Sequence, residues 1–223
     1  MEKYFKPSKS EKRGLKLLDP SFSNILSVGI STGGAAEINM AKKCPNAKVV
    51  ATTIDEKGLA FSNEKIANYP EASRIETKIE DVSKPMPYKD NTFDFVYARL
   101  VLHYLSKQQL NDALNEIFRI LKPNGLLFIV ARNNKEWEIK KPEFVVSYDE
   151  NTNLTTYYEQ WKKDVVRTRQ FLSNKQLQEI LTAHNFKVCK DKDYKEYLYT
   201  DYERTKKYKS KKPNYLTEIV ATK

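Results

Sequence analysis

The chain has 223 residues, which is enough for one α/β domain with a sizeable core and too few for two. No apolar run approaches the roughly 18 residues that a membrane span requires, and the lysine-rich start lacks the apolar region of a secretory signal. We therefore expect a single cytoplasmic domain with no membrane contact. The cysteines, Cys44 and Cys189, fit no metal-binding or CxxC spacing, so neither a metal site nor a disulfide framework is expected.

The basic charge of the chain raises the question of nucleic-acid binding. A total of 39 Lys and Arg residues against 29 Asp and Glu residues gives a formal net charge of +10, and such an excess can serve phosphate binding. The densest basic cluster is at 204–212, with Tyr202 and Tyr208 close by or within it. This cluster could contact RNA or could be a solvated turn, and we favour the turn.

Apolar runs of strand type alternate with segments of helical period along the chain. This alternation is typical of a doubly wound, Rossmann-like α/β fold with helices on both faces of the sheet. The predicted strands are 24–29, 47–54, 73–78, 92–98, 125–132, 186–193 and 215–222. The predicted helices are 34–43, 57–68, 106–121, capped by Ser106, and 173–184. We expect one domain over 1–223 with a seven-stranded, mostly parallel sheet whose last strand is antiparallel.

A Gly/Ser/Thr turn, Gly29–Gly34, joins the first strand to the first of these helices. Glycine permits positive φ and a close approach of the backbone to a ligand, and the free N–H groups of the helix start point at that ligand. In the dinucleotide fingerprint G-x-G-x-x-G the second glycine leaves room for a pyrophosphate, but Ser31 stands at that place. S-adenosylmethionine has no phosphate and tolerates a less open loop. Asp55, 22 residues beyond Gly33, ends the second strand, where a carboxylate can accept both ribose hydroxyls of either cofactor.

Two segments break the alternation. Residues 1–22 precede the first strand, and we interpret them as an N-terminal lid or tail. Residues 133–171 follow the fifth strand and contain three strand-type runs separated by polar turns, which predicts a small antiparallel β-meander. Such an insert would rise from the carboxyl edge of the sheet, where open α/β sheets bind ligands, so it is a possible substrate cap.

Together these motifs resemble the class I S-adenosylmethionine-dependent methyltransferases, in particular the small methyltransferase-domain group. Ile25–Gly33 is similar to the family's V-L-D-V-G-C-G-T-G loop and Thr53–Asp55 to its G-x-D ribose motif. Two later blocks are more specific. Residues 87–94 resemble L-P-F-x-D-x-S-F-D, and residues 116–125 resemble E-x-x-R-v-L-K-P-G-G.

The chain departs from the family pattern at two positions of the loop. Family members usually carry an acid where Ser27 stands and a glycine where Ser31 stands. The pattern S-x-G-x-S-T-G also resembles the loop of chemotaxis-receptor methyltransferases, which use the same cofactor.

The resemblance implies S-adenosyl-L-methionine as the cofactor and assigns a part of it to each of several residues. The methionine part would lie along Gly29, Ser31 and Gly33, the ribose on Asp55, the adenine on Asp81 and Val82, and the methionine tail beside Arg99. Two of these acids also have simpler interpretations: Asp55 as a surface acid, and Asp81 as the cap of a helix or loop.

Methyl transfer from a sulfonium is an in-line displacement that needs alignment and exclusion of water. By pKa, His103 is the candidate general base, although it could instead brace the helix start. The candidate substrate-binding residues are Tyr104, Tyr157, Trp161 and Arg169, and these side chains could instead pack within the domain.

We therefore expect methyl transfer to an oxygen or nitrogen of a small-molecule acceptor. The alternatives are an RNA methyltransferase that uses the basic loop 204–212 and a non-catalytic S-adenosylmethionine-binding protein. The oligomeric state does not follow from the sequence.

Overall fold

A computed structural model describes residues 7–159, 162–199, 210 and 212–223. Its main sheet has seven strands in the order β3-β2-β1-β4-β5-β10-β9. Strand β10 pairs antiparallel with both of its neighbours, and the other strands share one direction, which confirms the predicted topology. The strands are β1 (Asn24–Val28), β2 (Lys48–Thr53), β3 (Ile75–Ile79), β4 (Phe93–Arg99), β5 (Leu121–Arg132), β9 (Lys187–Glu196) and β10 (Asn214–Thr222).

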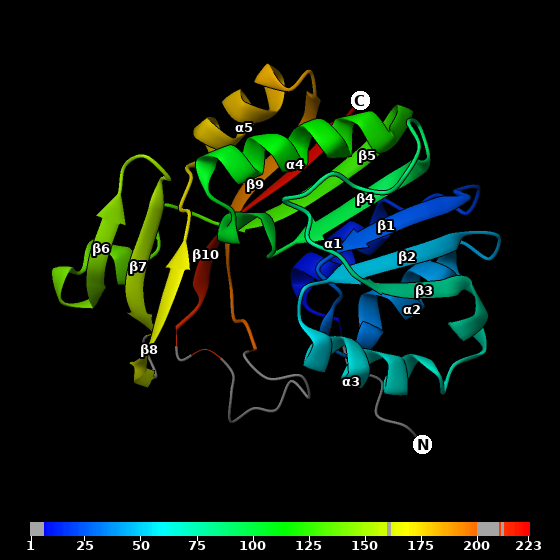
Figure 1. Cartoon of the computed structure of the whole chain (residues 1–223), viewed down its shortest axis with the longest axis horizontal. Coiled ribbons are helices and arrows are strands. Elements are labelled where there is room, and N and C mark those ends of the chain that lie inside the picture. Colours follow the sequence, from blue (N-terminus) through cyan, green and yellow to red (C-terminus); the bar gives the residue numbers. More distant parts are fainter. Residues whose placement is uncertain (1–6, 160–161, 200–209, 211) are drawn as a thin grey trace.

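Helices cover both faces of this sheet (Figure 1). They are α1 (Lys9–Lys16), α2 (Ala35–Lys43), α3 (Glu56–Ile66), α4 (Lys107–Ile120) and α5 (Asn174–Ala183). Strand β4 shows how its side chains alternate between two cores: Val96 and Ala98 pack with α4 and α5, whereas Phe95 and Tyr97 pack with α2. Apolar alternation along the central strands therefore builds the layers that the sequence predicts.

Helix α4 begins and ends as its sequence predicts. Ser106 accepts a hydrogen bond from the amide of Gln109, whose side chain in turn accepts one from the amide of Ser106, which is a capping box. The helix ends at Ile120, and the chain continues directly into β5, earlier than the predicted strand start at residue 125. Asn124 adopts a φ of +64°, in the left-handed region that asparagine tolerates.

Helix α1 lies within residues 1–22, where the sequence predicted no element. Ser8 and Glu11 form its capping box, and Gly14 is buried against the rings of Tyr97 and Phe128. Residues 9–16 are thus packed on the sheet instead of forming a free tail. A lid function for the N-terminal segment stays a prediction.

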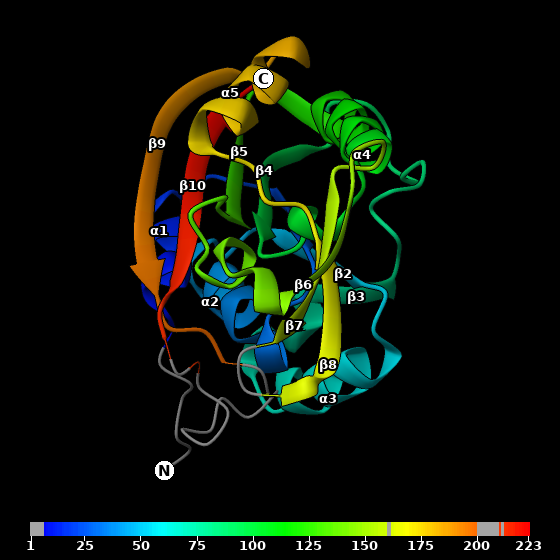
Figure 2. The same ribbon diagram turned by 90° about the vertical axis from the view of Figure 1, so that its left-hand side faces the viewer.

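Residues 133–171 contain the predicted antiparallel meander. Strands β6 (Val145–Asp149), β7 (Leu154–Glu159) and β8 (Lys162–Arg169) form a second sheet in the order β6-β7-β8. Figure 2 shows this insert sheet as a separate unit in front of the main sheet. Two backbone hydrogen bonds fix it to the segment after β4: Gln170 N to His103 O at 2.7 Å and Lys107 N to Thr152 O at 2.8 Å. The insert is therefore attached to the carboxyl end of a central strand.

Within the described residues, no helix is both long and apolar enough to cross a membrane. The same part of the chain holds no group of three or more His, Cys, Asp or Glu residues arranged to bind a metal ion.

Candidate functional site

The loop after β1 is shaped by glycines in left-handed backbone conformations. Gly29 has a φ of +76° and Gly34 a φ of +68°, values that side-chain-bearing residues rarely adopt. A Cβ on Gly34 would lie 2.5 Å from Cγ1 of Ile66, so that position has no room for a side chain. The amides of Gly29 and Ile30 both donate to the carbonyl oxygen of Thr52, at 2.9 and 2.8 Å, which ties the loop to β2. The result is a turn held against β2, and the cofactor contacts assigned to Gly29, Ser31 and Gly33 stay predictions.

The two positions that depart from the family pattern meet at one buried acid, Glu37. The Ser27 hydroxyl donates to Oε1 of Glu37 at 2.6 Å, and the Ser31 hydroxyl donates to Oε2 at 2.5 Å. The Ser31 amide also donates to Oε1, at 3.1 Å, and the Ser31 hydroxyl accepts from the amide of Ala36. Sequence reasoning did not single out Glu37. The available signal was an acid in the first turn of the helix that follows two unusual serines.

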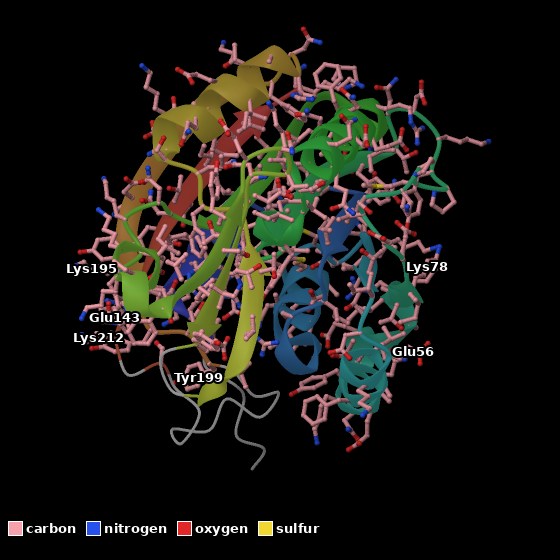
Figure 3. All side chains as sticks on the ribbon, turned by 60° about the vertical axis from the view of Figure 1, so that its left-hand side comes forward. Glu56, Lys78, Glu143, Lys195, Tyr199 and Lys212 are labelled. Atoms are coloured by element: carbon pink, nitrogen blue, oxygen red, sulfur yellow. The ribbon has the colours of Figure 1, made fainter. Side chains whose placement is uncertain are left out.

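The carboxyl ends of β2 and β3 carry the residues assigned to adenosine. Asp55 precedes α3, is exposed and makes no hydrogen bond that caps the helix. Beside it, Ile54 is 72% exposed, and Ile79 at the end of the neighbouring strand is 51% exposed. Exposed apolar side chains next to a carboxylate suit a flat base and its ribose, and the ribose contact assigned to Asp55 stays a prediction. Figure 3 labels Glu56, which follows Asp55 and marks this edge of the sheet.

Asp81 and Val82 lie in the turn after β3. Oδ1 of Asp81 accepts a hydrogen bond from the amide of Ser83 at 2.9 Å, so this carboxylate caps its own turn. The side chain of Val82 is buried in the core beside α4. The adenine contacts assigned to these two residues stay predictions.

Arg99 ends β4 and lies beside the start of the glycine loop, because β1 and β4 are parallel neighbours with Val28 opposite Ala98. Its Nε donates to the hydroxyl of Ser10 at 2.7 Å, and one of its terminal nitrogens donates to the hydroxyl of Ser8 at 3.0 Å. Arg99 therefore holds the start of α1. A contact with the methionine tail stays a prediction.

Three of the predicted substrate-binding residues come together where the insert meets the segment after β4. Arg169 donates to the hydroxyl of Tyr104 at 2.9 Å and also to the hydroxyl of Tyr157. Arg169 and Tyr157 are buried, and burial raises the pKa of Tyr157 to about 12, whereas Tyr104 is 49% exposed. Tyr104 is thus the member of this cluster that a ligand can reach.

Two predicted regions fall wholly or mostly outside the described residues. Trp161 lies outside the described residues, and so does most of the basic loop 204–212. Lys212, labelled in Figure 3, is described, and its Nζ lies 4.5 Å from the centroid of the Trp137 ring.

His103 is buried beneath the same cluster. Its ring lies 4.6 Å from the ring of Tyr104, centroid to centroid, and only 5% of the residue is exposed. It lines a small cavity between β5, α4, α5 and the segment after β8, and within the described structure its Nδ1 has no hydrogen-bond partner. Burial, together with the charges of Arg169 and Arg132, holds the pKa of His103 well below its ordinary value. The role of His103 as a general base stays a prediction.

Comparison with known proteins agrees with this geometry. Residues 26–129 match a family model described as a methyltransferase domain. A sterol 4-C-methyltransferase of Caenorhabditis elegans is 36% identical over 83 residues, which cover 37% of this chain and 24% of that protein. A demethylmenaquinone methyltransferase of Symbiobacterium thermophilum is 29% identical over 102 residues, covering 46% of this chain and 39% of that protein. The chain thus matches well under half the length of these curated relatives.

The fold has close counterparts among solved structures. A methyltransferase structure from Methanosarcina mazei superposes with a TM-score of 0.73 at 17% identity, covering 93% of this chain and 95% of that one. The fold is that of the class I methyltransferases, and the matched methyltransferase domain covers residues 26–129. A methyltransferase domain therefore lies within the chain, and its fold, shared with solved S-adenosylmethionine-dependent methyltransferases, supports S-adenosyl-L-methionine as the cofactor.

Proposed function

We propose that the protein transfers the methyl group of S-adenosylmethionine to an oxygen or nitrogen of a small molecule. The observation that carries this proposal is the cluster of Arg169, Tyr104 and Tyr157, which joins the insert to the segment after β4. Parallel sheets of this type bind their ligands at the carboxyl ends of the strands, and the insert is attached at that edge. We therefore place the small acceptor between the cofactor loop and the insert.

The bound cofactor would supply an electrophilic methyl group on its sulfonium. The task of this chain's residues is to align the acceptor and exclude water. The hydroxyl of Tyr104 accepts a hydrogen bond from Arg169, so its own proton is left to donate to an acceptor. A neutral amine or a carboxylate could react without a base. A neutral alcohol or phenol would have to lose its proton, and His103 is the candidate to take it.

A carbon acceptor is the second candidate. It is favoured by the relatives, because one of them is named as a sterol 4-C-methyltransferase. A guanidinium beside the acceptor would also stabilise an enolate or phenolate oxygen adjacent to a nucleophilic carbon.

The test is a transfer assay with cofactor labelled in the methyl group, run separately on small-metabolite extracts and on RNA. We expect label in the small-molecule fraction, and mass spectrometry of the product distinguishes O-, N- and C-methylation. Label in RNA only, with activity that falls steeply with salt, would replace the proposal with RNA methylation.

The cofactor-binding side has its own control. Asp55→Ala should abolish binding of S-adenosylhomocysteine in titration calorimetry, whereas Glu64→Gln, an exposed change on the same helix, should not. Cofactor binding in the wild type with no transfer to any fraction would indicate a non-catalytic binding protein. Binding of NAD in place of S-adenosylhomocysteine would contradict the cofactor.

A further inference from the structure

Glu37 is a fully buried carboxylate in the first turn of α2. It is held by the two serine hydroxyls and by the amide of Ser31, which are all neutral donors. Among the described residues, no lysine, arginine or histidine forms an ion pair with it. A negative charge therefore lies directly beneath the cofactor loop, and in the described part of the chain it is held by neutral donors.

Such a charge is costly to bury unless something compensates it. The helix N-terminus offsets a part of the cost, and the three hydrogen bonds offset more. A carboxylate can accept about four hydrogen bonds, so Glu37 also keeps some acceptor capacity. The cofactor is cationic, with an ammonium group on its amino-acid end. A cation bound on the loop would balance the part of the Glu37 charge that the protein's own groups do not compensate.

The position of Glu37 also accounts for both departures from the family loop. Its Oε1 lies 2.6 Å from the hydroxyl of Ser27, which stands where family members usually carry an acid. An aspartate at position 27 would bring a second negative charge against Glu37. A glycine at position 31 would remove the hydroxyl that donates to Oε2. The three residues therefore form one hydrogen-bonded set, in which the acid stands on the helix and not on the strand.

We propose that Glu37 is a positioning residue that holds the cofactor loop and supplies the negative charge for the cofactor's ammonium group, acting through Ser31. This inference rests on the cofactor and deepens the proposed function. Glu37 does not touch the transferred methyl group. Its effect should fall on the amino-acid end of the cofactor and spare the adenosine end.

The test compares two ligands that differ in that end. S-adenosylhomocysteine carries the ammonium group, whereas 5′-methylthioadenosine lacks the whole amino-acid part. In titration calorimetry, Glu37→Gln, which is neutral and nearly isosteric, should weaken S-adenosylhomocysteine by about tenfold, equivalent to about 1.4 kcal/mol. Its Kd for methylthioadenosine should change by less than about twofold. Glu64→Gln removes an exposed charge from α3 and should change neither Kd.

A double variant that places the acid on the strand serves as the rescue experiment. Ser27→Asp combined with Glu37→Gln returns the acid to the strand and should restore much of the lost affinity for S-adenosylhomocysteine. Equal weakening of both ligands by Glu37→Gln, or weakening of neither, would overturn the proposal, because the residue would then be only structural or dispensable. A wild type that binds S-adenosylhomocysteine but transfers no methyl group would refute the proposed function and leave this inference intact.

Discussion

Replacing Gly14 with alanine tests whether α1 is a fixed part of the domain. In an exposed helix the change would stabilise the protein by up to about 1 kcal/mol, because alanine is the better helix former. Here a Cβ on Gly14 would lie 2.6 Å from the ring of Tyr97 and 2.7 Å from the ring of Phe128. Both rings are fully buried and stack on each other, so they cannot move aside freely. Overpacking of this kind costs about 1–3 kcal/mol, and we expect a net loss of about 1–2 kcal/mol.

The assay is thermal and denaturant unfolding of Gly14→Ala beside the wild type. A loss of 1–2 kcal/mol corresponds to a fall in Tm of about 2–8 °C for a chain of this size. Lys12→Ala is the matched control, because it changes an exposed position of the same helix and leaves the packing intact. If Gly14→Ala instead raised the Tm, helix propensity would have outweighed packing. Helix α1 would then spend much of its time off the sheet, as a lid would.

Three further predictions concern the buried polar groups around the insert. Burial raises the pKa of Glu136 to about 7, so the folded state holds this proton more tightly than the unfolded state. The free energy of unfolding of the wild type should therefore fall by up to about 3 kcal/mol as the pH rises from about 4.5 to about 7. Glu136→Gln should flatten that dependence in denaturant titrations at several pH values. His103→Ala removes a buried ring and should lower the free energy of unfolding by about 1–3 kcal/mol. A variant with an unchanged Tm and a low turnover would instead assign His103 the role of base. Arg169→Lys keeps the charge but cannot hold both tyrosine hydroxyls in the same way. The Tm should therefore fall, while the Kd for S-adenosylhomocysteine should stay within about twofold of the wild-type value. A matching loss of cofactor affinity would show that the insert also supports cofactor binding.

The seven strands of the main sheet and four of the five α-helices in the described structure followed from the sequence, and apolar patterns are clearest in elements such as β4 and α4. Helix α1 could not be predicted in that way. Its buried residues are Ser10, Glu11 and Gly14, which carry no apolar signal. What holds this helix is distant in sequence: the side chains of Arg99 and Glu196 both contact Ser10. Propensity and periodicity describe local segments, so an element fixed by distant polar contacts escapes them.

The candidate site likewise combines features that follow from local sequence with features that depend on the fold. Glycine positions and the acid at Asp55 are local features, and their backbone geometry agrees with the loop that the sequence predicts. The exposure of Ile54 and Ile79 depends on where two parallel strands end side by side, which periodicity does not give. Glu37 was missed because an acid in a first helical turn is normally solvated. Its burial follows only from the fold of the loop above it.

The division of the chain also bears on substrate choice. The matched methyltransferase domain ends at residue 129, and the meander with Tyr157 and Arg169 lies beyond it. The two parts meet at a few contacts, chiefly between Arg169 and Tyr104 and between Gln170 and His103. A cofactor loop can therefore stay unchanged while the insert is altered, provided that these contacts are kept. The curated relatives match less than half of this chain, so the acceptors in their names do not fix the acceptor of this protein. Substitutions in the insert that preserve Arg169 should thus change which acceptor is methylated before they change cofactor affinity.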